Sequence, residues 1–166
     1  IELIKELKED LRIFGEFPVY EQKYSVKFPR IFAQLIGDFY GINFYTYESH
    51  ISDRILQISK ENLRFGIRAF VDDEGSIYSH SIRITSANYK LLSGIRKILD
   101  HLEIKSNEIK SQKNFKAKYG KTYYLDVRDI EKYYEQIGSS HLKKNLLLEK
   151  YFASIKNKKL LKTQTL

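Results

Sequence analysis

The chain has 166 residues, of which 42% are hydrophobic, so it can bury one substantial core or two small packed repeats. Its formal net charge of +8 favours a polyanionic partner such as nucleic acid. Cysteine is absent, which excludes disulfides and thiolate metal sites, and no apolar run approaches the length that spans a bilayer. We therefore expect an intracellular, cytoplasmic protein without a membrane partner.

The first 45 residues predict a helix, two strands and a second helix. IELIKELKEDLRIFG has apolar residues at helical spacing, with Gly15 placed to end the helix. FPVYEQK and YSVKF suggest short strands, and PRIFAQLIGDFYG returns to helical spacing. The chain begins at Ile1 and contains no methionine, so we expect its natural start to lie upstream.

A connector follows at 46–58, with a short helix expected after Ser52. Residues 59–155 then predict a longer unit in which Ser59 caps a helix that runs to about Glu74. An alternating segment to Ser86, a second helix, a lysine-rich hairpin and two more helices complete it. Residues 156–166 read as a basic, irregular tail.

The two segments repeat one pattern. YYLDVRDIEKYYEQIG parallels KYSVKFPRIFAQLIG, with Val127 and Arg128 where Val26 and Lys27 fall. We therefore expect a duplicated fold, in which the second copy is complete and the first lacks its opening helix and hairpin.

Three adjacent carboxylates end the helix of the second unit, in the stretch FVDDEGSI (70–77). Negative charges at this end oppose the helix dipole, so local stability does not account for them. Carboxylate oxygens are ligands that Mg²⁺ accepts, although a solvated helix end without a ligand is the alternative reading.

The motif IRAFVDDEG (67–75) resembles the signature of the LAGLIDADG homing endonucleases. The resemblance extends to the strand order after it, the helix start at 86–88, the YLDVRDIEKYYEQIG junction and the SSHLKKNLLLEKY helix. The resemblance implies an α+β fold, an αββαββα repeat with a curved antiparallel sheet, preceded by a truncated repeat. It also implies double-stranded DNA as the partner.

The resemblance further implies that two acidic helices pack together, the second from a missing N-terminal half or a homodimer partner. By position Glu74 is then the catalytic carboxylate that holds Mg²⁺, Gly75 turns the chain into a strand, and Ala69 lets the helices approach. Asp73 departs from the family pattern, in which this position is small. Lys27 and Arg128 match the family's basic residue at the strand-to-helix junction, and ordinary surface charge is the alternative for both.

Basic residues on the strands and the last helix are the expected DNA contacts. Arg83 alternates with isoleucines and should point away from the core, towards guanine or phosphate. Lysines at a hairpin also protect sheet edges from aggregation. The remaining candidates, on the hairpin and at the start of the last helix, are Lys110, Lys113, Lys116, Lys118, Lys121, Lys143 and Lys144.

Three functions remain open from the sequence. The first is a Mg²⁺-dependent, site-specific DNA endonuclease that needs a second acidic helix. The second is a non-catalytic DNA-binding regulator on the same scaffold. The third, an RNA-binding or protein-interaction domain, would use the 13 tyrosines and 10 phenylalanines for stacking, but most of these fall at expected core positions.

Overall fold

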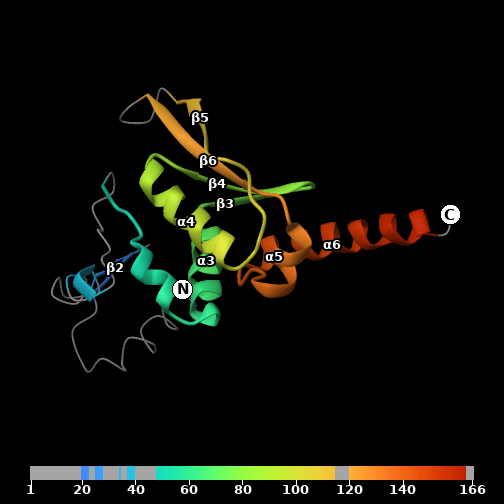
Figure 1. Cartoon of the computed structure of the whole chain (residues 1–166), viewed down its shortest axis with the longest axis horizontal. Coiled ribbons are helices and arrows are strands. Elements are labelled where there is room, and N and C mark those ends of the chain that lie inside the picture. Colours follow the sequence, from blue (N-terminus) through green and yellow to red (C-terminus); the bar gives the residue numbers. More distant parts are fainter. Residues whose placement is uncertain are drawn as a thin grey trace. The chain divides into compact units, whose positions relative to one another are not determined.

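The computed structural model describes the backbone of residues 20–22, 25–27, 34, 37–39, 48–114 and 120–163. The chain divides into two compact units, Ile1–Ile42 and Asn43–Leu166. In the first unit, β1 (Tyr20–Gln22) pairs antiparallel with β2 (Ser25–Lys27), as two of the predicted strands (Figure 1). The helix expected at the start of the chain lies outside the described residues.

The second unit has the predicted αββαββα order, followed by a further helix. A 3-10 turn, η2 (Asp53–Gln57), comes first, where a short helix was expected after Ser52. The elements are then α3 (Lys60–Glu74), β3 (Gly75–Tyr78), β4 (Ser81–Ser86), α4 (Tyr89–His101), β5 (Lys110–Lys113), β6 (Lys121–Val127), α5 (Ile130–Gln136) and α6 (Leu142–Thr163). The prediction of an α+β fold is confirmed.

Side-chain caps fix where the helices begin. The Ser59 hydroxyl accepts from the Asn62 amide at 3.2 Å, so α3 starts at the predicted cap. The Asn88 side chain caps α4 and also donates to the carbonyl of Ser49 at 2.6 Å, which ties the segment before η2 to this helix. Asp129 caps α5.

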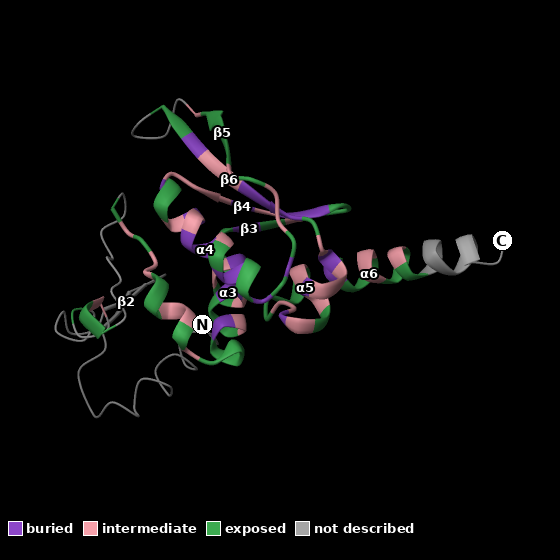
Figure 2. Cartoon of the chain, viewed as in Figure 1, coloured by how far each residue is buried: buried purple, intermediate pink, exposed green. Residues whose placement is uncertain are grey.

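The four strands form one antiparallel sheet in the order β3-β4-β6-β5, and α3 and α4 pack on one of its faces (Figure 1). Alternate residues of β4 and β6 supply the buried side: Ile82, Ile84, Leu125 and Val127 are fully buried. Figure 2 shows buried positions along both strands and on α3 and α4. The opposite side of the sheet is here called the outer face.

The last helix is longer than the sequence suggested. The segment expected to be an irregular tail from residue 156 continues α6 as far as Thr163. Between Leu142 and Thr163 there is no glycine or proline to end a helix, which accounts for the extension. Leu148 anchors α6 in the core with 0% exposure. No helix in the described part of the chain is long and apolar enough to cross a bilayer.

Candidate nucleic-acid interface and acidic helix end

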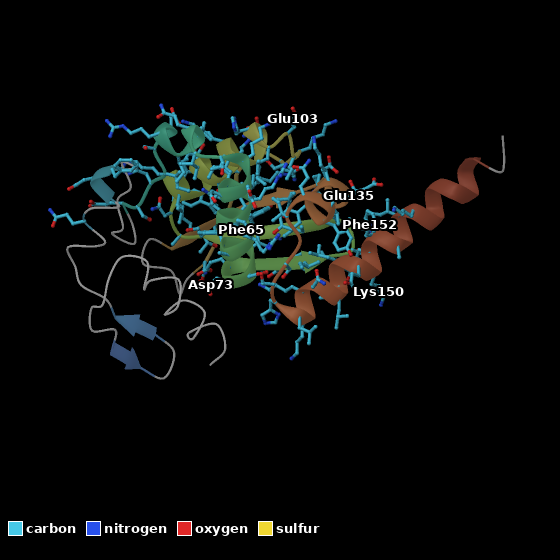
Figure 3. The ribbon with its side chains drawn as sticks, turned by 90° about the horizontal axis from the view of Figure 1, so that it is seen from below. Phe65, Asp73, Glu103, Glu135, Lys150 and Phe152 are labelled. Carbon is cyan, nitrogen blue, oxygen red and sulfur yellow. The ribbon has the colours of Figure 1, made fainter. Side chains whose placement is uncertain are left out.

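The acidic triplet lies at the C-terminal end of α3, where β3 begins. Glu74 is the last residue of the helix, and both Glu74 and Asp73 are exposed. Neither carboxylate has a hydrogen bond or ion pair to a described residue. Figure 3 shows Asp73 at one end of α3, with Phe65 further back along the helix. Two free carboxylates thus stand next to the first strand of the sheet.

Asp72 has a different role from its two neighbours. Its carboxylate accepts hydrogen bonds from the Ser139 hydroxyl and, at 2.8 Å, from the Ser140 amide. These contacts hold the loop between α5 and α6 against the end of α3. Asp72 is therefore a structural carboxylate in this chain.

Lys144 explains how the helix end tolerates so much negative charge. Its Nζ donates to the backbone carbonyls of Val71 at 2.9 Å and Asp72 at 2.8 Å. A cation on the terminal carbonyls offsets the negative pole of the helix dipole. The expected DNA contact of Lys144 stays a prediction, but in the structure its ammonium group already binds α3.

Gly75 is required by close packing. Its φ of −86° is open to any residue, but a Cβ at this position would lie 2.5 Å from the Val71 carbonyl oxygen and 2.7 Å from Val71 Cγ1. Only glycine lets the chain leave the helix this closely and enter β3.

Strand register defines the outer face of the sheet. Ser76 lies opposite Arg83, and Arg83 lies opposite Asp126, so these three side chains share that face. By the same alternation the face consists of Ser76, Tyr78, Ser81, Arg83, Thr85, Lys110, Gln112, Thr122, Tyr124 and Asp126. It is polar and aromatic, and it begins two residues after Glu74.

Arg83 is fixed at the centre of the outer face. Its guanidinium forms a two-point ion pair with Asp126, at 2.7 and 3.1 Å, and lies 4.2 Å from the ring centroid of Tyr124. The hydrogen bond to Asp126 raises the pKa of Arg83. The residue points away from the core, as expected, with its side chain 34% exposed.

Arg128 belongs to the same charged cluster. It follows β6, where its Nε donates to Asn107 Oδ1 at 3.1 Å and its Nη2 lies 3.5 Å from Asp126 Oδ2. Asp126, with a side chain only 3% exposed, thus bridges Arg83 and Arg128. The cluster holds both arginines in place, and Arg128 lies just before the start of α5.

The lysines predicted on the hairpin divide between the two faces of the sheet. Lys110 lies on the outer face, whereas Lys113 and Lys121 lie opposite each other on the other face, at the end of the β5–β6 hairpin. All three are exposed. Like charges directly across two strands repel, so an anion near this hairpin would be stabilising. Lys116 and Lys118 lie outside the described residues.

Two other candidates are placed only in part. Lys27 ends β2, but its side chain is not described, and the helix expected after it lies outside the described residues except at 34 and 37–39. Lys143 is exposed at the start of α6 and, unlike Lys144, donates no hydrogen bond to α3. The structure therefore brings Arg83 and Arg128 together through Asp126, and places Lys144 rather than Lys143 at the acidic helix end.

The sequence did not reveal Asp72, Asp126 or the role of Lys144. An aspartate within an otherwise buried strand segment, YYLDV, is a signal for a buried partner, but only the strand register identifies it as Arg83. The partner of Lys144 depends on how α6 packs, which no local pattern specifies.

Comparisons with known proteins agree with this fold. Residues 61–138 match the family model described as a LAGLIDADG-like domain. No curated protein is similar enough in sequence to match the chain.

Three solved structures of I-DmoI superpose on the chain, each with 18% identity. A glycine-to-serine variant in complex with its target DNA and 2 mM Mg has a TM-score of 0.52 and covers 84% of this chain and 72% of its own. The complex with DNA and Ca also has a TM-score of 0.52, covering 85% and 68%. The structure of mesophilic variants of the homing endonuclease I-DmoI has a TM-score of 0.53 and covers 85% of this chain and 69% of its own. Residues 61–138 therefore match a LAGLIDADG-like domain, and the chain has the fold of the homing endonuclease I-DmoI.

Proposed function

We propose that the chain binds double-stranded DNA on the outer face of the β3-β4-β6-β5 sheet and, with a second acidic helix, hydrolyses a phosphodiester with the help of a divalent cation. The observation that carries the proposal is the free, exposed carboxylate of Glu74 at the point where α3 meets that sheet. I-DmoI, which shares the fold, has been crystallised with DNA and with Mg or Ca.

The outer face supplies the means to bind DNA. Arg83 and Lys110 lie on it among tyrosine, serine, threonine and glutamine side chains, which can contact base edges and phosphates. Asp126 holds Arg83 in one orientation, so little of its side-chain freedom would be lost on binding.

Glu74 fits one part of a magnesium site. Mg²⁺ commonly takes one or two protein carboxylates, completing its shell with water and substrate phosphate oxygens. No group of three acidic, histidine or cysteine side chains gathers among the described residues, so further ligands would come from a second helix and the DNA. A bound cation would stabilise charge on the phosphate and activate a water molecule.

The exposed side of α3 can receive the second helix. Gly66 and Ala69 are both exposed, and a Cβ added at Gly66 would meet nothing within 4 Å. Small residues three apart on one helix let another helix approach closely. The second helix can come from a preceding half or from another copy of the chain.

A non-catalytic DNA-binding regulator is the second candidate. One observation favours it: no further acidic, histidine or cysteine side chains gather with Glu74 into a group of three among the described residues, and one carboxylate does not complete the site. In this function the arginine cluster and the lysines bind DNA, and Glu74 contributes nothing. An intracellular location remains our expectation for both functions.

One experiment separates the two functions. Duplexes that the full chain retains are selected from a randomised pool in EDTA, cloned into a supercoiled plasmid, and incubated with the chain and Mg²⁺. An endonuclease nicks or linearises the plasmid with the selected site and spares a plasmid with a scrambled site. A chain that binds the duplex and leaves both plasmids supercoiled is a regulator, and one that retains no duplex refutes both functions.

A further inference from the structure

A second charged site lies on the N-terminal half of α3. It is a pocket of about 260 Å³ lined by Glu61, Arg64, Phe65, Arg68 and Gln136. Arg64 and Arg68 precede Glu74 by ten and six residues, so at 1.5 Å per residue they lie about 15 and 9 Å from it along the helix axis. The pocket is thus separate from the acidic end.

Glu61 lines the same pocket as the two arginines but forms no ion pair with either of them. Arg68 Nε donates to the backbone carbonyl of Ile137 at 2.6 Å, and Arg64 Nη2 makes a long contact of 3.4 Å with Gln136 Oε1. Within the described part of the chain, no carboxylate forms an ion pair with either guanidinium. Arg64 Nε is buried without any hydrogen-bond partner. A buried N–H without an acceptor is unfavourable, so this pocket is poised for an anion.

The surroundings of the pocket resemble a protein interface. Phe65 is 52% exposed, and the guanidinium of Arg68 lies 5.2 Å from its ring centroid. Exposed aromatic and arginine side chains together are typical of the residues that dominate protein–protein binding energy. Figure 3 shows Phe65 on α3, well away from Asp73.

We propose that this pocket binds the carboxylate of an acidic side chain on a protein segment that packs beside α3. The planar guanidinium groups suit two-point binding of a carboxylate. Gln136 Oε1 faces Arg64, which leaves the amide nitrogen of Gln136 as a further donor. A carboxylate seated here would accept from the guanidinium groups of Arg64 and Arg68 that line the pocket, and a small turn of the Arg64 side chain would also bring its Nε within reach.

A protein carboxylate fits better than a nucleic-acid phosphate. The pocket is formed by α3 and α5, whereas proposed DNA binding uses the outer face, opposite the face on which α3 packs. The inference does not depend on nuclease activity. The pocket would therefore favour segments that carry an acidic residue beside Arg64, because any other segment leaves the Arg64 guanidinium without an acidic partner.

Arginine side-chain NMR tests the proposal on the full chain. The Nε–Hε signal of Arg64, identified by its loss in Arg64→Gln, is followed while glutarate or inorganic phosphate is added. We expect a saturable shift with glutarate and binding of phosphate that is weaker by about threefold or more.

Two variants separate recognition from bulk charge. Arg64→Lys keeps the charge but loses the planar fork, and should weaken glutarate binding about fivefold, followed at the Arg68 Nε–Hε signal. Gln136→Leu should also weaken it. Arg96→Gln removes a partly exposed arginine from α4, away from the pocket, and should leave glutarate binding unchanged. The backbone amide spectrum confirms that each variant is folded.

Three results overturn the proposal. They are no saturable shift with glutarate, equal affinity of Arg64→Lys and the unaltered chain, and tighter binding of phosphate than of glutarate.

Discussion

Replacing Lys144 with methionine tests how the acidic end of α3 is held. The change keeps most of the side-chain volume and removes the ammonium group that donates to the Val71 and Asp72 carbonyls at 2.9 and 2.8 Å. A hydrogen bond from a charged group contributes about 1.5–3 kcal/mol when buried, and a cation at a helix C-terminus about 0.3–1 kcal/mol. Because this site is only partly buried, we expect a total loss of about 2 kcal/mol.

Urea unfolding followed by circular dichroism measures the loss as a lower midpoint at unchanged slope. Lys143→Met is the matched control, because Lys143 is the exposed neighbour on the same turn and donates no hydrogen bond to α3. It should cost less than about 0.5 kcal/mol, as surface substitutions usually do. If both variants lose equal stability, the ammonium contact with α3 does not stabilise the fold.

Three further changes address the packing around this site. Gly75→Ala places a Cβ 2.5 Å from the Val71 carbonyl oxygen and should lower the unfolding free energy by about 2 kcal/mol in the same urea assay. Gly66→Ala meets nothing within 4 Å and should raise it by about 0.5–1 kcal/mol, since alanine favours the helix; a loss there would show that α3 is crowded on this side. Asp126→Asn should cost about 2 kcal/mol and weaken duplex binding in a filter assay, because Arg83 loses the carboxylate that orients it; unchanged binding would mean that Arg83 does not contact DNA.

Local patterns predicted the elements of the second unit well. Ser59 and Asn88 cap their helices, and the isoleucines that flank Arg83 in β4 are buried, because caps and alternation act over a few residues. The end of α6 was missed, since lysine-rich segments can be irregular or helical according to their context. The sequence also could not show which basic residues already have protein partners.

In the candidate site, too, the local features were predictable and the long-range contacts were not. Glu74 was predicted at a helix end beside a strand, and it lies there, free and exposed. Its neighbour Asp72 differs only through contacts with Ser139 and Ser140, some 70 residues away, which depend on the packing of α5 and α6. The pocket around Arg64 likewise depends on a contact between α3 and the end of α5.

The central claim is that Glu74 serves DNA cleavage and not DNA binding. The most direct test compares Glu74→Gln with Asp73→Asn, its exposed neighbour on the same helix end, on one selected duplex with Mg²⁺. The account predicts that Glu74→Gln binds the duplex with an affinity within about threefold of the unaltered chain and cuts it at least about a hundredfold more slowly, whereas Asp73→Asn still cuts. Undiminished cutting by Glu74→Gln would contradict it.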